Sequence, residues 1–418
     1  MRLLSFLLVA AIIPTFSLSF ASRACFAQLQ QEEVRGSPAE PSDAAETRAQ
    51  IAQVEKLLPG FADPGAAFYF IAGAHRHLGE ILDALSNLKK CVDLEEGFDP
   101  SGDPVFAGLQ GSHDFDSLVE KAQRDFRPVS HSRVAVWTDE RDLIPYGLEW
   151  DSRKNLFYLS SLNRRKIIQL TLESRASDFV PSGRDHILPV RGIRVAASDG
   201  TVWASSSTQE GQSELLHFDP SGKLLGRFAP GASGPHTFND LVIAGRNGVF
   251  VTDGLGNAVL HFDPRNRTFS KLVLHRPLFY PSGIALDKDR QTLFVADSLG
   301  VIRVNLSDGS NRDVDPGHRN TLAGASGLYW HAGSLIAIQN GIGSPRVATF
   351  KLSEDASRVT HTTILEYRTM LTSLPTTGAL RGSDFYFITN SHMDNLLNNV
   401  IRDTTLLEPV RIAVVSIP

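Results

Sequence analysis

Cysteine is almost absent from this sequence. The 418 residues include only Cys25 and Cys91, and Cys25 lies in an N-terminal segment that we expect to be removed. A mature chain with one cysteine cannot form an internal disulfide, and one thiolate cannot build a cysteine-rich zinc site. The sequence therefore excludes a disulfide scaffold and a thiolate metal centre.

A strong net charge is also absent. The chain has 41 lysines and arginines against 46 aspartates and glutamates, so it lacks the global field of a nucleic-acid or anionic-membrane binder. Beyond the first residues, no apolar run is long enough to span a bilayer. Glycine (33) and proline (22) are plentiful, which is typical of a turn-rich β protein. We expect no nucleic-acid partner and no membrane span in the mature chain.

The first residues differ from the rest. Arg2 precedes an apolar run over residues 3–20 that Pro14 interrupts, and small residues follow, with cleavage after Ala21 or Ala27 in keeping with the pattern. This order is typical of a secretory signal peptide, which we assign to residues 1–27. A retained membrane anchor is the alternative, but the proline and the short run argue against it. We therefore expect an exported protein, periplasmic or extracellular.

One short motif recurs six times. Each copy is a β-rich run that ends in small polar residues, and the copies are spaced roughly 40–50 residues apart, the period of a four-stranded propeller blade. The fold class is therefore mainly β, with a six-bladed β-propeller over residues 131–418. The motifs LFYLSS, VWASSS, VFVTDG, LFVADS, LIAIQN and FYFITN begin at Leu156, Val202, Val249, Leu293, Leu335 and Phe385.

The sequence also predicts how the ring closes. Blade six has two strands near Thr377 and Phe385, an insert over 395–400, and a third strand over 411–417. Residues 132–137 form an unassigned strand before blade one, which we predict to be the missing fourth strand. Pairing the two ends would remove the exposed edges of an open sheet. We expect a monomer.

The region before the propeller has two parts. Residues 28–45, rich in Glu, Pro, Ser and Ala, read as a flexible linker. Residues 46–130 carry apolar residues at helical spacing. Within them, residues 67–94 resemble a tetratricopeptide helix pair, although Glu96 stands where a proline is usual. The module could be a structural cap or a peptide-binding groove, and both interpretations stay open.

Polar residues gather at one end of the predicted channel. Strands one and two of a blade are antiparallel, so the start of one and the end of the other share that end. The ends of the second strands supply Asp253 and Asp297, while His236 and His392 flank the same opening. The residues that open the first strands form a ring: Tyr146, Arg191, Asn239, Ser282, Ser326 and Thr377.

The blade openings carry a resemblance to a known family. Pro-Tyr-Gly-Leu-Glu-Trp-Asp, Phe-Asn-Asp-Leu and Pro-Ser-Gly-Ile-Ala-Leu-Asp resemble those of the regucalcin/gluconolactonase (SMP-30) family and its paraoxonase and strictosidine-synthase relatives. The likeness covers roughly residues 134–418, and NHL-type propellers share the same rhythm. It implies a lactonase that holds Ca²⁺ or Zn²⁺ at the channel mouth. The implied ligands are a carboxylate from blade one, asparagines from the middle blades and an aspartate from a later blade.

This chain keeps little of that ligand set. Asn239 matches, but the blade-one carboxylate falls on Tyr146, the later asparagine on Ser282 and the aspartate on Ser326. Glu149 lies three residues away, and an odd shift along a strand points it to the opposite face. A hard divalent cation needs carboxylate oxygens, so we expect no cofactor.

A repaired metal site is the alternative. It would hold Ca²⁺ or Zn²⁺ on Asn239, Asp253 and Asp297. The two aspartates could instead cap the turns after their strands by bonding the backbone.

Arg191 is the most unusual member of the ring. A cation among hydroxyl and amide groups suits an anionic or polyhydroxylated ligand, although it could pair with Asp253, Asp297 or Asp185 instead. We predict a non-catalytic propeller that binds a small polar or anionic ligand, or a protein partner, through the ring residues and His236. The alternative is a metal-dependent lactonase or ester hydrolase. A metal-free enzyme of the strictosidine-synthase kind would need an inward glutamate, and no blade supplies an obvious one.

Overall fold

The computed structural model describes residues 41–231, 234–287, 289, 291–397 and 399–418. The predicted signal peptide and most of the predicted linker lie outside these ranges. Helix α2 (Pro41–Leu57) includes residues 41–45, which composition had assigned to the linker. Proline fits the first turn of a helix, and Asp43 complements its dipole, so the helix starts at Pro41 rather than at Glu46. None of the described helices is long and apolar enough to cross a membrane.

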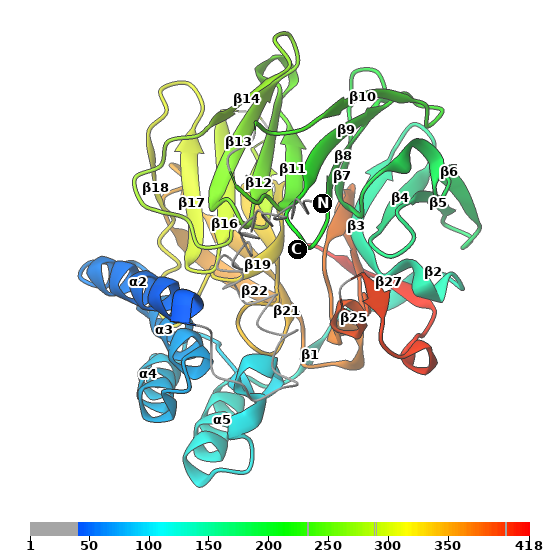
Figure 1. The fold of residues 1–418 in the computed structure, drawn as a ribbon. Helices are drawn as coiled ribbons and strands as arrows, with labels where there is room; N and C mark the ends of the chain where they lie inside the picture. The colour runs from blue at the N-terminus through cyan, green and yellow to red at the C-terminus, as the bar shows by residue number, and fades with distance from the viewer. Residues whose placement is uncertain (1–40, 232–233, 288, 290, 398) are drawn as a thin grey trace, which may run out of the picture.

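The strands form a six-bladed propeller, which Figure 1 shows with its blades arranged around a central axis. Blade one contains β3 (Pro145–Asp151), β4 (Leu156–Ser161), β5 (Ile167–Thr171) and β6 (Ala176–Val180). Blade two contains β7 (Val190–Val195), β8 (Val202–Ser207), β9 (Ser213–Phe218) and β10 (Leu224–Phe228). Blade three contains β11 (Phe238–Ile243), β12 (Val249–Asp253), β13 (Ala258–Asp263) and β14 (Thr268–Lys271).

The other three blades complete the ring. Blade four contains β15 (Ile284–Leu286), β16 (Thr292–Asp297), β17 (Gly300–Asn305) and β18 (Asn311–Asp313). Blade five contains β19 (Ala325–His331), β20 (Ser334–Gln339), β21 (Arg346–Leu352) and β22 (Val359–Tyr367). Blade six contains β23 (Gly378–Arg381), β24 (Asp384–Ile388), β27 (Val410–Ser416) and β2 (Arg133–Thr138). All six predicted repeat motifs lie on the second strand of a blade, so the predicted fold is confirmed.

Apolar residues fill the spaces between blades. Tyr158 of blade one packs with Ile193 and Val202 of blade two, and all three are fully buried. The inner strands must also approach closely: a Cβ on Gly147 would lie 2.2 Å from the carbonyl oxygen of Arg191 on the next blade. Only glycine allows this approach, which explains why a glycine follows the ring position in most blades.

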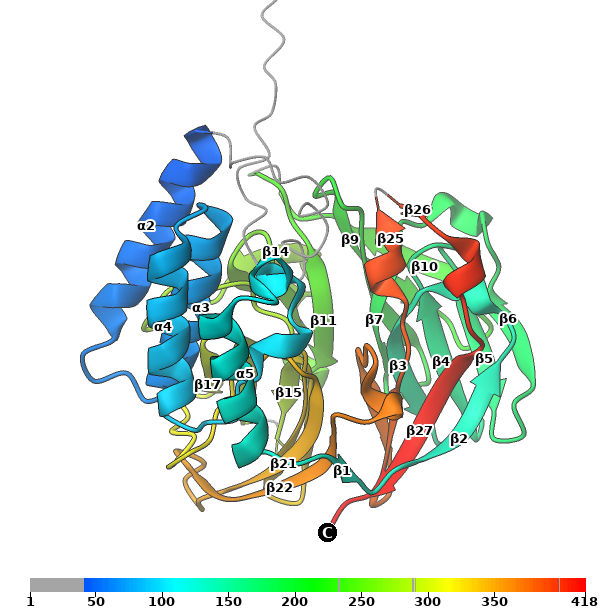
Figure 2. The same cartoon turned by 90° about the horizontal axis from the view of Figure 1, so that it is seen from below.

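Blade six closes the ring as predicted. Strand β27 pairs antiparallel with β24 on one side and with β2 on the other, where Val136 faces Ile412. Figure 2 shows β2 and β27 side by side although they come from opposite ends of the propeller sequence. The insert forms a small hairpin of β25 (Leu396–Leu397) and β26 (Val400–Ile401). The exposed edges that an open sheet would present are therefore joined to each other.

The helical module stands beside blades four and five (Figures 1 and 2). It contains α2, α3 (Pro64–His77), α4 (Ile81–Asp93) and α5 (His113–Asp125). Helices α3 and α4 form a hairpin that reverses at Gly79, whose φ of +76° suits glycine. One such pair does not establish a tetratricopeptide repeat, so that likeness stays a prediction.

Contacts fix the module to the ring. The Phe70 and Phe279 rings meet at 5.1 Å, and the buried Asp63 accepts a hydrogen bond of 2.6 Å from Thr321. The next segment, β1 (Val129–Ser130), pairs with β22 as a fifth strand of blade five, so the chain joins the propeller at Val129. The module packs against its own propeller, as a structural cap would.

Candidate binding site at the channel mouth

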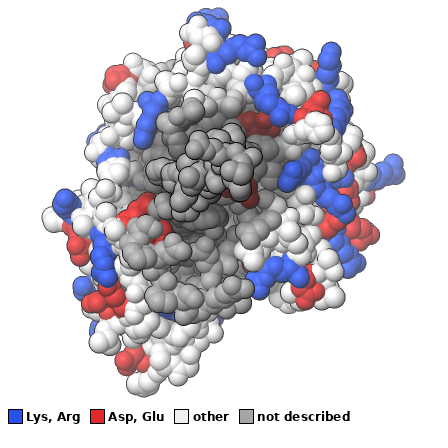
Figure 3. Space-filling view, viewed as in Figure 1, with Lys and Arg blue, Asp and Glu red and all other residues white. Residues whose placement is uncertain are grey.

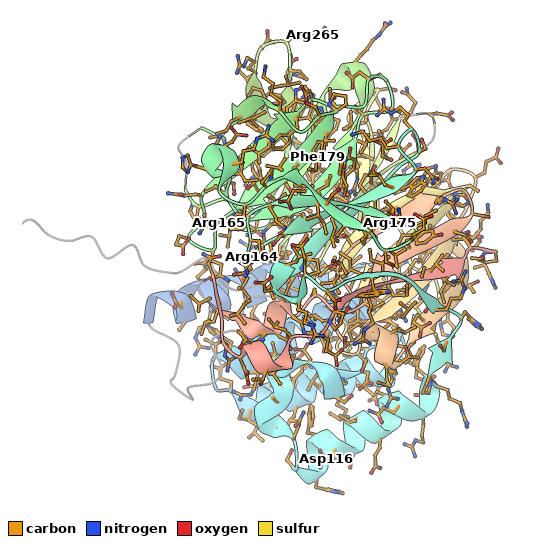
Figure 4. The ribbon with its side chains drawn as sticks, turned by 90° about the vertical axis from the view of Figure 1, so that its right-hand side faces the viewer. Asp116, Arg164, Arg165, Arg175, Phe179 and Arg265 are labelled. Atoms are coloured by element: carbon orange, nitrogen blue, oxygen red, sulfur yellow. The ribbon has the colours of Figure 1, made fainter. Side chains whose placement is uncertain are left out.

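The channel has two ends, which we call the first mouth, where the innermost strands begin, and the second mouth, where they end. Figure 4 views blade one from outside and labels residues at both ends of it. Arg164 and Arg165, in the turn after β4, lie toward the first mouth, and Arg175, in the turn before β6, lies toward the second. Figure 3 shows positive and negative side chains interspersed around the face that carries the first mouth, consistent with the small net charge.

Three ring residues meet at the first mouth. Arg191 donates a hydrogen bond of 3.2 Å from Nη1 to Asn239 Oδ1, and its guanidinium carbon lies 5.1 Å from the centre of the Tyr146 ring. Burial raises the pKa of Tyr146, while Arg191 and a hydrogen bond with Ser282 act in the opposite direction. The arginine is therefore held between an aromatic face and an amide.

The ring hydroxyls connect neighbouring blades. Ser326 Oγ donates to the carbonyl of Thr376 at 2.8 Å, and Ser282 Oγ donates to the carbonyl of Ser326 at 3.4 Å. Thr377 Oγ1 donates to the carbonyl of Tyr146 at 2.5 Å and accepts from the amide of Leu148 at 3.0 Å. Thr377 thereby joins blade six to blade one. These side chains satisfy backbone carbonyl and amide groups at the ends of the inner strands.

A cavity of about 120 Å³ opens at the first mouth. Four of the predicted ligand-binding residues line it, Tyr146, Arg191, Ser282 and Ser326, and so does Asp297 from the predicted metal set. Asn239, Thr377 and His236 do not. Sequence reasoning missed the contributions of other segments, because no local pattern reveals which loops fold over a channel. Asp103 comes from the helical module, Tyr280 from the loop before blade four, and Met393 and Asp394 from the insert of blade six.

Several buried polar atoms of the lining residues are unpaired. Among the described residues, none provides a hydrogen-bond partner for Arg191 Nε, Asn340 Oδ1 or Thr376 Oγ1. Buried polar groups normally have a partner, either protein, water or ligand. All three residues line the cavity, and their unpaired atoms lie just beneath its surface, where a small side-chain rotation would let a ligand reach them.

Asp103 adds a titratable group to the cavity wall. Burial raises its pKa to about 6, against the lowering effect of hydrogen bonds from Tyr69 and from the amide of Val105. The Tyr69 hydroxyl donates to Oδ2 at 2.7 Å, and the amide donates to Oδ1 at 3.0 Å. Near neutral pH this carboxyl changes charge, and the cavity changes with it.

The proposed metal ligands do not fit a divalent cation. Both carboxylate oxygens of Asp297 accept from the Arg276 guanidinium, at 2.6 and 3.1 Å, and its Oδ1 also accepts from the amide of Leu299. Asn239 turns Oδ1 to Arg191 and donates from Nδ2 to the carbonyl of Pro281 at 3.0 Å. An arginine already occupies the oxygens of each of these two residues, which opposes the binding of a second cation there.

Asp253 has a different partner. His236 Nδ1 lies 2.5 Å from Asp253 Oδ2, and this bond raises the pKa of the histidine. The other oxygen accepts from the amides of Thr237 and Gly256, at 2.8 and 3.0 Å, so Asp253 caps the turn after β12. His236 is thereby held beside the mouth as part of an aspartate pair rather than as a residue of the cavity wall.

Comparisons with known proteins do not assign this chain to a family. No protein-family model matches the sequence, and no curated protein matches it. Solved structures that it is similar to include a gluconolactonase from Xanthomonas campestris, at 15% identity over 69% of this chain and 89% of that chain, with a TM-score of 0.46. Virginiamycin B lyase from Staphylococcus aureus is 12% identical over 69% of this chain and 99% of that chain, with a TM-score of 0.47.

A putative oxidoreductase (glucose dehydrogenase) from Thermus is 13% identical over 68% of this chain and 99% of that chain, also with a TM-score of 0.47. At these values the likeness carries no argument about function.

Proposed function

We propose that this protein is an exported, non-catalytic propeller that binds a small anionic, hydroxyl-bearing ligand at the first mouth. The proposal rests on the environment of Arg191. Its guanidinium has no ion-pair partner among the described residues, and its Nε–H is buried without an acceptor. Export rests on the sequence of residues 1–27 alone.

Arg191 is the part of the wall that favours an anion with hydroxyl groups; the wall also carries Asp103, Asp297 and Asp394, of which Asp297 is neutralised by Arg276. A guanidinium binds carboxylate or phosphate through charge-assisted hydrogen bonds, which are stronger than neutral ones. Asn340 Oδ1 and Thr376 Oγ1 suit ligand hydroxyls, and Tyr146 and Tyr280 supply flat apolar walls. Since one water needs roughly 10–15 Å³ of such space, a cavity of about 120 Å³ takes several waters or one small molecule.

Calorimetric titration with matched probes tests the proposal. Gluconate and glycerate carry one carboxylate and several hydroxyls, while sorbitol and glycerol are their neutral counterparts. We expect the anions to bind more tightly, and Arg191→Ala to weaken their binding by about tenfold or more because the charge-assisted bonds are lost. Arg191→Lys keeps the charge but not the fork of donors, so an intermediate loss is expected.

Arg312→Ala is the matched control. Arg312 is well exposed, lies on blade four and makes only a distant ion pair with Asp355 at 3.7 Å. Its removal is expected to leave the titration unchanged. Equal binding of anions and polyols, or an unchanged affinity in Arg191→Ala, would remove Arg191 from the site and refute the proposal.

A metal-dependent lactonase or ester hydrolase is the competing function. The geometry of Asn239, Asp253 and Asp297 argues against it, since their oxygens are already engaged by Arg191, His236 and Arg276. A panel of lactones and aryl esters, assayed with and without a chelator and alongside metal analysis, decides between the two. Chelator-sensitive turnover with a tightly held Ca²⁺ or Zn²⁺ would replace our proposal with the enzymatic one.

A further inference from the structure

The second mouth contains a larger cavity, of about 480 Å³. Residues from the innermost strands of all six blades line it, so it occupies the channel axis like the first cavity but at the other end. The ring residues of the first mouth do not take part in it. Its chemistry can therefore be considered independently of the proposed function.

The rim of this cavity is mostly apolar. In five blades the residue four positions after the ring residue is apolar and half-buried: Trp150, Val195, Ile243, Leu286 and Trp330. In blade six the corresponding residue is Arg381, whose guanidinium lies 5.1 Å from the Trp150 ring centre. The repeat therefore places two indole rings at one opening, and one of them already contacts a cation.

Charged groups lie just inside the rim. Arg194 donates from Nη2 to Asp240 Oδ2 at 2.8 Å, and Asp240, which is fully buried, also accepts from the amide of Leu241 at 2.8 Å. This pair is satisfied. Arg194 also lies over the ring of Tyr329, at 5.6 Å from the ring centre.

Glu149 is the surplus charge in this group. Its Oε2 is 4.0 Å from Arg194 Nη1, and its Oε1 accepts one long hydrogen bond of 3.4 Å from the amide of Val195. Among the described lining residues and their contacts, one arginine thus serves two carboxylates, Glu149 and Asp240. Arg381 is committed to the Trp150 face. An incompletely compensated carboxylate in a partly buried site is costly, and a bound cation would remove that cost.

We propose that the second mouth binds a small organic cation, an ammonium or guanidinium on an apolar body, with Glu149 as its counter-ion. Trp150 and Trp330 contact the apolar body, and Trp330, which stacks on Phe294 with one face, attracts the charge with the other. The same preference is visible within the protein, where Arg381 and Arg194 lie over Trp150 and Tyr329. The cavity is large enough for a ring-sized group, and the carboxylate fixes which end of the ligand enters.

Three probes of equal size test the charge preference on the full-length wild-type protein. Benzylammonium, benzyl alcohol and benzoate share one ring and differ in charge. Ligand-observed NMR titration at pH 8 is expected to show binding in the order cation, neutral, anion, with at least a tenfold gap between the first and the last. Equal binding of the alcohol and the ammonium, a preference for benzoate, or no saturable binding of benzylammonium in the tens of millimolar would each overturn the proposal.

Variants then locate the site. Glu149→Gln keeps the side-chain shape and is expected to weaken benzylammonium binding about tenfold while leaving benzyl alcohol binding unchanged. Glu408→Gln, an exposed carboxylate paired with Arg411 on blade six, is the matched control. Arg191→Ala should leave amine binding unchanged, because Arg191 is at the other mouth. Loss of amine binding in Arg191→Ala, or its retention in Glu149→Gln, would show that the cation binds elsewhere.

Discussion

The two mouths of the channel are built by the same six strands, yet they present opposite chemistry. At the first mouth an arginine stands among hydroxyls and amides without a carboxylate partner, and at the second a carboxylate stands beside an arginine that is already paired. The difference shows that the blade repeat sets the positions of side chains but not their charges. Each mouth can therefore acquire its own ligand while the ring itself is unchanged.

Removing one arginine from each mouth tests the difference between the two mouths with the largest expected effect. Arg194→Ala leaves the fully buried Asp240 without its partner and is expected to cost roughly 3–5 kcal/mol of unfolding free energy. Arg191→Ala removes interactions with neutral groups only, the Asn239 amide and the Tyr146 side chain, so we expect about 1–2 kcal/mol. Urea unfolding measures both.

The double variant Arg194→Ala with Asp240→Asn provides the control for that experiment. Replacing the unpaired Asp240 carboxylate by a neutral amide should recover part of the lost unfolding free energy, since that loss comes from an uncompensated buried charge. Similar losses from Arg191→Ala and Arg194→Ala would mean that the two arginines play equivalent structural roles.

The titration of Glu149 at the second mouth is expected to make stability depend on pH. Burial raises the pKa of Glu149 to about 7, with Asp240 and Asp151 acting in the same direction and Arg194 against them. Tyr329 also faces this group. Between about pH 4.5 and 7 the Glu149 carboxyl is protonated in the folded state and ionised in the unfolded state. The unfolding free energy therefore decreases as pH rises through this range. Glu149→Gln should remove that decline, on the order of 2 kcal/mol.

The measurement is the unfolding free energy of wild type and Glu149→Gln from pH 4.5 to 8. Asp63 and Asp103, with pKa values raised to about 6, and Glu96, with one raised to about 8, contribute slopes of the same sign in both proteins. Only the difference between the two curves therefore reports on Glu149. Parallel curves would contradict the assignment.

The smallest expected effect belongs to Asp103 at the first mouth. As its pKa is about 6, the carboxyl becomes negative as pH rises from 5 to 7, and anion binding at Arg191, in the wall of the same cavity, should weaken by about threefold. Asp103→Asn should abolish that pH dependence while keeping the acceptor for Tyr69. Gluconate titrations at pH 5 and 7.5 measure it, and an unchanged dependence in the variant would place its origin elsewhere.

Much of the fold could be predicted from the sequence because it repeats. The six motifs mark the second strand of every blade, and the missing fourth strand of blade six pointed to residues 132–137, which include most of β2. The boundary before α2 was wrong by a few residues because Glu, Ser and Ala occur both in linkers and in helix starts. Composition does not separate those two states.

The site could be predicted only where it follows the repeat. Tyr146, Arg191, Ser282 and Ser326 line the first cavity because they open inner strands. Asp103 could not be placed, since its position depends on how the helical module docks on blades four and five. Asp297 forms an ion pair with Arg276, in the loop before blade four, and the spacing of these residues in the sequence does not predict it. Strand parity placed Glu149 on the face opposite Tyr146, but a β-bulge between Pro145 and Leu148 interrupts the alternation, and Glu149 lines the cavity of the second mouth.

The seam between β2 and β27 also governs the order of assembly. Strand β2 precedes the blades in the sequence, but its partner β27 is the last strand of the chain. Until β27 has formed, the edge of β2 is unpaired and can pair with other chains. Val134 and Trp137 on β2 stay partly exposed even after the seam forms. A chain that ends before residue 410 would therefore leave the ring open, with unpaired strand edges on β2 and β24. We expect such a species to aggregate and to be bound by chaperones or degraded by proteases.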